Sequence, residues 1–218
     1  MIQQIFKVKD AFALGWKLTK QHWLVMVGLY LGYTIVAMIL NLFSGSEFSA
    51  RYFIVMAITI LFQYLFMAGY TKMYLNAADG EEPEFSAFGQ MAKRFLPFFL
   101  TSLLFGIATV IGISLLIVPG IWFLVRFGLA PMVIIDKENT SVIEAFKESY
   151  RLTDGHSWPI LGFYGVSILV VLLGLICLIV GVFLAYVVVL FASVCMYRML
   201  QYQLSLETQK ENETVIQE

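Results

Sequence analysis

The chain has 218 residues, of which 60% are hydrophobic and 13% are charged, and its formal net charge is −1. A soluble domain carries about 25% charged and about 45–50% apolar residues, so this composition excludes an ordinary soluble protein. The near-neutral charge, with no basic stripe interleaved with aromatic residues, excludes a nucleic-acid partner. The apolar residues gather in long runs, which indicate membrane spans.

Six of these runs are predicted to cross a membrane as helices. They are residues 23–43, 52–74, 95–118, 121–135, 158–179 and 181–200. The fourth run is short, because fifteen helical residues cover about 22 Å, against a hydrocarbon core of about 30 Å. Pro119-Gly120 is expected to turn the chain before this run, and Pro131 to kink it.

An amphipathic helix is expected before the first, third and fifth runs. Residues 1–22 place Phe12 and Trp16 on one face and lysines on another, and residues 85–95 repeat this arrangement. The third helix begins at a capping box, Ser141 to Glu144. Such helices suit the plane of a bilayer surface. The predicted fold class is therefore an all-α polytopic membrane protein with six transmembrane helices in three hairpins, each preceded by a cytoplasmic-side amphipathic helix.

Lysine and arginine residues set the expected orientation. Most of the fourteen fall in the N-terminal helix, the two amphipathic connectors, their flanks and the tail. By the positive-inside rule this places both termini in the cytoplasm of a bacterium, with the spans in its inner membrane. The first 22 residues lack the form of a cleavable signal. Cys177 and Cys195 are too far apart to form a disulfide if Gly181 marks a helical turn.

The chain is predicted to form one transmembrane domain, residues 1–205, and a polar tail, residues 206–218, that becomes disordered. A short pattern, Ala-Phe-x4-Lys/Arg, begins at Ala11, Ala87 and Ala145. It divides the domain into repeat units of about 1–75, 84–135 and 141–200. The first and third units also match at one fixed offset. Leu18, Thr19, His22, Gly28 and Tyr30 correspond to Leu152, Thr153, His156, Gly162 and Tyr164. Duplication explains these identities; the alternative is that interfacial helices before spans share a composition.

The stretch from Pro119 to Trp158 resembles a bacterial membrane-protein family. The matching residues are Pro119, Gly120, Ile121, Arg126, Pro131, Asp136, Glu144, Ala145, Ser149, Leu152, Thr153, Gly155 and Trp158. That family groups uncharacterised six-helix inner-membrane proteins with the membrane domain of some glycerophosphoryl diester phosphodiesterases. The resemblance implies the six-span layout. It implies no phosphodiesterase activity, because this chain lacks the soluble catalytic domain of the fused relatives.

Arg126 is identified as the only charge in the middle of a span. An arginine there needs acceptors, and no aspartate or glutamate is assigned to any span, so carbonyls, hydroxyls, water or a lipid phosphate are expected to hold it. Its role is either structural, in which case the guanidinium donates to backbone carbonyls near Pro119-Gly120, or functional, in which case it binds an anion. Lys17, Lys93, Arg94 and Arg151 are candidate partners of anionic lipid headgroups.

The remaining polar residues form no recognisable catalytic or metal-binding set. His22 and His156 occur at matching positions before spans and lack further ligands, so no metal or cofactor is predicted. The leading hypothesis is a non-enzymatic inner-membrane protein that handles lipid or a small amphiphile or supports a membrane partner. Its expected partners are membrane lipids, together with another membrane protein or a second copy of the chain. The alternatives are a small transporter or channel-like translocator and, third, a membrane enzyme acting on lipid.

Overall fold

A computed structural model describes residues 2, 4–43, 49–176 and 178–217, and every regular element among them is an α-helix. The helices are α1 (Val8–Leu42), α2 (Ala50–Ala78), α3 (Ser86–Lys93), α4 (Phe95–Leu115), α5 (Ile117–Phe127), α6 (Ala130–Asp136), α7 (Val142–Thr153), α8 (Ser157–Ile176) and α9 (Leu178–Gln217). Six segments are long and apolar enough to cross a membrane. Their number and order confirm the prediction; α5 and α6 together make the fourth, Ile117–Asp136.

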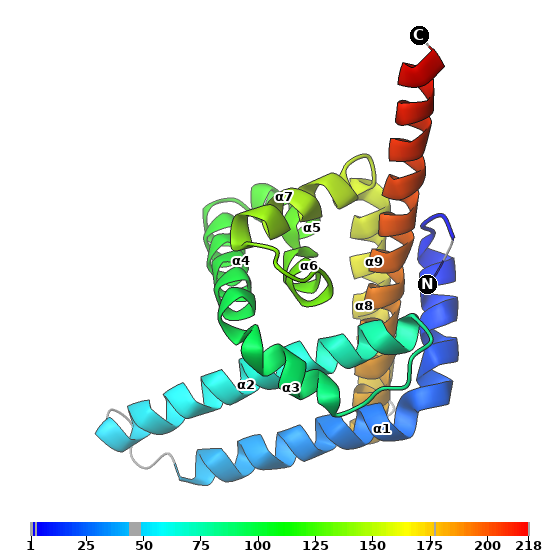
Figure 1. Ribbon diagram of the computed structural model, residues 1–218. Helices are drawn as coiled ribbons and strands as arrows, with labels where there is room; N and C mark the ends of the chain where they lie inside the picture. Colours follow the sequence, from blue (N-terminus) through cyan, green and yellow to red (C-terminus); the bar gives the residue numbers. More distant parts are fainter. Residues whose placement is uncertain (1, 3, 44–48, 177, 218) are drawn as a thin grey trace.

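Helix α9 is the core of the bundle. Its residues from 194 to 200 are all buried, whereas the other spans expose many large apolar side chains on their outer faces. Helices α1, α8 and α2 pack around it (Figure 1). A helix that is apolar all round is expected at such a position. The exposed apolar faces of the outer helices are suited to acyl chains.

The N-terminal helix and the first span form one helix, not the two separate elements expected. No Gly or Pro interrupts the sequence near residue 22 to end the first helix, and the ribbon of α1 instead changes direction along its length (Figure 1). Its first part packs against α9, where Gly15 meets Ala192. A Cβ on Gly15 would lie 2.7 Å from the backbone nitrogen of Ala192. A small residue is therefore required for the two helices to approach this closely.

The turn between α4 and α5 lies at Leu116, three residues before the predicted Pro119-Gly120 turn. Leu116 leaves the helical conformation, with φ −155° and ψ 127°. Pro119 sits in the first turn of α5, where the missing N–H is harmless. Gly120 packs against α4, because a Cβ there would clash with the backbone nitrogen of Ile113. The Pro-Gly pair thus starts the helix and allows close packing, and the extended residue before it turns the chain.

The fourth span is broken near its middle. Helix α5 ends at Phe127, and α6 starts at Ala130 with Pro131 in its first turn. Proline has no backbone N–H to donate to the carbonyl of the preceding turn, so a helix that continued through Pro131 would lose one backbone hydrogen bond. The sequence predicted a kink at Pro131, and the structure shows a full break in the helix instead.

The polar connections gather beside residues 198–203 of α9. Asp79, after α2, and Asp136, at the end of α6, both contact Arg198, and His156, before α8, contacts Gln203. The backbone N–H of Phe6 also donates to Gln203, at 3.4 Å. We call this region, where these elements meet, the polar end of the bundle.

The repeated pattern has a common structural position in all three units. Ala11, Ala87 and Ala145 are each fully buried. Between the first and third units, Thr19 and Thr153 are buried and each hydroxyl donates to the carbonyl four residues earlier. The units differ at the next step, because Asp154 to His156 separate α7 from α8 whereas α1 is continuous. Duplication stays a prediction.

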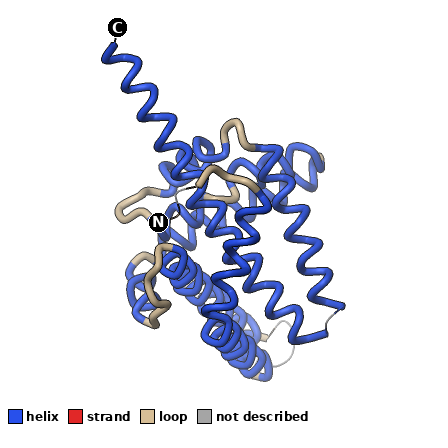
Figure 2. Tube along the Cα trace, turned by 90° about the vertical axis from the view of Figure 1, so that its right-hand side faces the viewer, coloured by secondary structure: helices blue, strands red, loops and turns tan. Residues whose placement is uncertain are grey.

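The tail is helical and not disordered as expected. Helix α9 continues to Gln217, and its C-terminal part projects beyond the other helices in both views (Figure 1, Figure 2). Its sequence after Leu206 is polar, with Glu, Thr, Gln and Lys, and nothing in it breaks a helix. Cys195 is a buried free thiol. Cys177 lies outside the described residues, so the expectation about the two cysteines stays a prediction.

Candidate functional site

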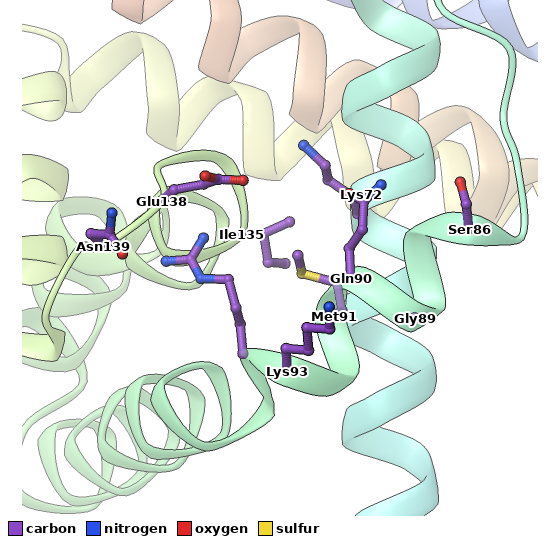
Figure 3. A pocket seen from close by; sticks show the side chains of 10 residues that line it. Lys72, Ser86, Gly89, Gln90, Met91, Lys93, Ile135, Glu138 and Asn139 are labelled. Carbon is purple, nitrogen blue, oxygen red and sulfur yellow. The ribbon is translucent and has the colours of Figure 1, made fainter.

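A basic pocket lies between α2, α3 and the loop after α6. Its volume is about 640 Å³. It is lined by Lys72, Ser86, Gly89, Gln90, Met91, Lys93, Arg94, Ile135, Glu138 and Asn139. Figure 3 shows Lys72 and Lys93 on one side, Glu138 and Asn139 on the other, and Ile135 between them.

Helix α3 positions the basic side of this pocket. Ala87 and Met91, four residues apart, are buried, so α3 packs through one face and presents Gln90 and Lys93 on another. Arg94 follows at the junction with α4, with φ −111°. The third cation, Lys72, belongs to α2 and was not a candidate on sequence grounds, because it lies within a predicted span.

Arg94 is only partly satisfied by protein groups. Its Nη2 donates to the carbonyl oxygen of Lys137, at 2.8 Å. Its Nη1 is buried and has no hydrogen-bond partner among the described residues. A buried charged donor left without an acceptor is costly, and an anion in the pocket would satisfy it.

The pocket carries an excess of positive charge. Three cations, Lys72, Lys93 and Arg94, face one carboxylate, Glu138, so the lining has a formal charge of 3 − 1 = +2. Among the described residues, neither Lys72 nor Lys93 forms an ion pair. The structure therefore brings together two of the predicted basic residues, Lys93 and Arg94, and adds Lys72.

Arg126 binds a carboxylate, and the expectation that only carbonyls, hydroxyls, water or lipid hold it is wrong. Its Nη1 donates to Asp154, at 2.8 Å, and its guanidinium lies 4.8 Å from the ring centre of Tyr150. Its side chain is only 13% exposed. The sequence-based argument failed because Asp154, in the loop after α7, was not assigned to a span, although α7 packs directly on α5.

The backbone of Arg126 shows why α7 docks at this point. The break after Phe127 leaves the Arg126 carbonyl without its usual helical donor. The hydroxyls of Ser149 and Thr153 donate to it, at 2.9 and 3.2 Å. Both hydroxyls are on buried residues of α7. The interruption in the fourth span and the polar residues of α7 are therefore complementary, and they have a structural role.

The Arg126–Asp154 pair predicts a pH-dependent stability. The Arg126 guanidinium donates to Asp154 and lowers the pKa of that carboxyl from its ordinary value of 3.8. Because the pKa is lower in the folded state, the pair stabilises the fold above the ordinary value and is lost as the pH falls through the folded-state pKa. We expect the difference in Tm between the natural protein and Arg126→Gln to shrink between pH 6 and pH 3. The effect is small because Asp154 is exposed. A constant difference over that range would contradict the assignment.

A second charge cluster, centred on Arg198, was missed in the sequence. Arg198 is 4% exposed and lies inside α9, so Arg126 is not the only charge within a span. It donates to Asp136, at 2.6 Å, to Gln201, at 2.8 Å, and to Asp79. Asp136 also accepts from the hydroxyl of Tyr197, at 3.0 Å. The cluster ties the ends of α2 and α6 to the core helix.

The other predicted residues have local roles or exposed positions. Lys17 is exposed on α1, and Arg151 is 64% exposed and lies 3.9 Å from Glu148. Glu144 completes the predicted capping box of α7 with Ser141. Gly155 adopts φ +70°, a conformation that favours glycine, and Trp158 is 83% exposed.

The two histidines have different surroundings. His22 lies beside the ring of Phe191, with ring centres 6.3 Å apart. His156 contacts the side-chain nitrogen of Gln203, at 2.7 Å. Across the described part of the chain, no three His, Cys, Asp or Glu side chains are grouped so as to hold a metal ion.

The fold and the site together define a class of protein. Within the described ranges, six helical segments have the length and hydropathy of membrane spans, and their polar connections meet at one end with a basic pocket beside them. The chain is a polytopic membrane protein. No protein-family model, curated protein or solved structure matches it.

Proposed function

We propose that this protein is a non-enzymatic membrane protein that binds the phosphate of an anionic amphiphile in the basic pocket. The observation that carries the proposal is the buried Nη1 of Arg94, which has no hydrogen-bond partner among the residues that the structure describes and lies beside Lys72 and Lys93. The Nη1 of Arg94 can donate a charge-assisted hydrogen bond to a phosphate oxygen while Nη2 stays bound to the Lys137 carbonyl, and the lysines add point charges. The surplus of positive charge in the lining favours a ligand with a formal negative charge.

The location of the pocket fits a lipid headgroup. It lies where α2, the short helix α3 and the loop after α6 meet, next to the polar connections. Basic pockets beside the cytoplasmic ends of spans bind anionic headgroups. We propose that the polar end faces the cytoplasm of a bacterial cell, as the distribution of Lys and Arg predicts. We also propose that the chain belongs to the six-helix family that the motif resembles. Its protein partner is proposed to be a second copy of the chain or another membrane protein.

Binding of phosphate-bearing ligands tests this function. Each charge-assisted hydrogen bond contributes about 1.5–3 kcal/mol, so Arg94→Gln should weaken binding roughly tenfold or more. The purified protein in neutral-lipid nanodiscs is titrated with inorganic phosphate and, separately, reconstituted with phosphatidylglycerol, and the Tm is followed. Lys93→Gln with Arg94→Gln should abolish the stabilisation by both ligands.

A matched control separates the pocket from general surface charge. Lys17→Gln removes one exposed positive charge from α1, away from the pocket lining. It should leave both stabilisations unchanged. If the natural protein responds to neither ligand, or if Lys17→Gln has the effect of Arg94→Gln, the basic pocket is not the binding site.

Coupled transport is the second candidate, and one observation favours it. No Asp or Glu was assigned to a span from the sequence, but in the structure Asp79 and Asp136 meet at Arg198, and Asp79 Oδ1 is buried with no hydrogen-bond partner in the described part of the chain. Ionisable groups inside membrane proteins often mark proton or ion pathways. Uptake of labelled phosphate into proteoliposomes under a pH gradient separates transport from binding alone.

A further inference from the structure

A second, apolar cavity lies between α2 and α4 and is closed by α6 and α9. Its volume is about 660 Å³. It is lined mainly by apolar and aromatic side chains. Among them are Met67 of α2, Phe99 and Leu103 of α4 and Ile135 of α6. Pockets of this size and character hold small ligands in other proteins.

The apolar cavity adjoins the basic pocket. Ile135 lines both. Two consecutive residues of α2 line different cavities: Thr71 lines the apolar cavity and Lys72 lines the basic pocket. A ligand with a charged end and an apolar end could therefore bind with its charged end in the basic pocket and its apolar end in the apolar cavity, on opposite sides of Ile135.

The apolar cavity also opens outward. Met67 and Ile60 of α2 and Leu103 of α4 line it and are more than one-third exposed. These residues belong to spans, so their exposed faces meet acyl chains in a bilayer. A chain already in the membrane can reach this cavity without passing through water.

We propose that the ligand is an intact membrane lipid, with its phosphate in the basic pocket and one acyl chain in the apolar cavity. This inference rests on the proposed function for the phosphate and extends it to the chain. The hydroxyl of Ser102 lines the cavity, is buried and has no partner among the described residues. It supplies a donor that an ester oxygen of a lipid would satisfy and a bare hydrocarbon would not.

Filling the apolar cavity tests the assignment of the chain. Met67→Trp combined with Leu103→Trp places bulk at its mouth on both helices. We expect stabilisation by inorganic phosphate to stay within about twofold of the natural protein, while the affinity for phosphatidylglycerol in neutral-lipid nanodiscs falls roughly tenfold or more. Leu104→Trp is the matched control, since Leu104 is the next residue of α4, is 50% exposed and does not line the cavity.

The outcomes distinguish the two proposals. If the natural protein binds neither phosphate nor lipid, the proposed function fails. If phosphate binds and the two tryptophans leave lipid affinity unchanged, or lower it no more than Leu104→Trp does, the acyl chain does not occupy the apolar cavity and the inference fails. If phosphate binds and phosphatidylglycerol does not, the inference also fails and the pocket takes a free phosphate compound.

A conservative reporter covers the case in which the double variant does not fold. Phe99→Trp puts an indole in the lining of the apolar cavity. Phosphatidylglycerol with brominated chains should quench its fluorescence more than brominated phosphatidylcholine does, and Lys93→Gln with Arg94→Gln should remove the difference. Equal quenching by the two lipids in the Phe99→Trp protein overturns the inference.

Discussion

Replacing Arg198 by methionine should destabilise the protein by about 3 kcal/mol or more, because removal of one partner from a buried ion pair leaves the other uncompensated. Both carboxylates that Arg198 holds, Asp79 and Asp136, are mostly buried, with side chains 24% and 12% exposed. Their contacts join α2, α6 and α9, so the loss should loosen three helices at once. Unfolding by sodium dodecyl sulfate in mixed micelles measures the change.

Two comparisons make this prediction specific. Arg151→Met removes an exposed arginine with one distant carboxylate partner and should change the stability by less than about 1 kcal/mol. Adding Asp79→Asn and Asp136→Asn to Arg198→Met should recover part of the lost stability, because the stranded charges are then gone. An Arg198→Met protein as stable as Arg151→Met would mean that the cluster contributes little to the fold.

The second large effect is expected at Gly15, where α1 crosses α9. Gly15→Ala should destabilise the protein by about 1–3 kcal/mol, the usual cost of overpacking. The new Cβ would lie 2.7 Å from a backbone nitrogen of α9, and backbone atoms cannot move aside as a flexible side chain can. The same unfolding measurement applies.

Gly28→Ala is the control for this change. Gly28 lies in the same helix, and a Cβ there would meet nothing within 4 Å. The substitution should be neutral or stabilising by up to about 1 kcal/mol, since alanine favours helix more than glycine. Equal effects of the two alanines would show that helix propensity, and not the contact with Ala192, determines the stability at Gly15.

The sequence by itself determined the elements, because these depend on local properties. Runs of apolar residues long enough to cross a bilayer identified six spans, and the capping box at Ser141 and Glu144 located the start of α7. Pro131 indicated a kink in the fourth span, and the structure shows a full break there, between α5 and α6. The turn predicted at Pro119 and Gly120 fell three residues earlier, at Leu116.

Only the tertiary structure decided which charges meet. Arg198 and Asp79 are 119 positions apart, and Arg126 and Asp154 belong to different helices. Span boundaries drawn from hydropathy hid these partners, because Asp79, Asp136 and Asp154 fall at or beyond the ends of spans. Lys72 likewise joins Lys93 and Arg94 only because α3 folds back onto α2. Such contacts depend on how helices pack, because helix periodicity shows which face of a helix is apolar but not which other helix that face contacts.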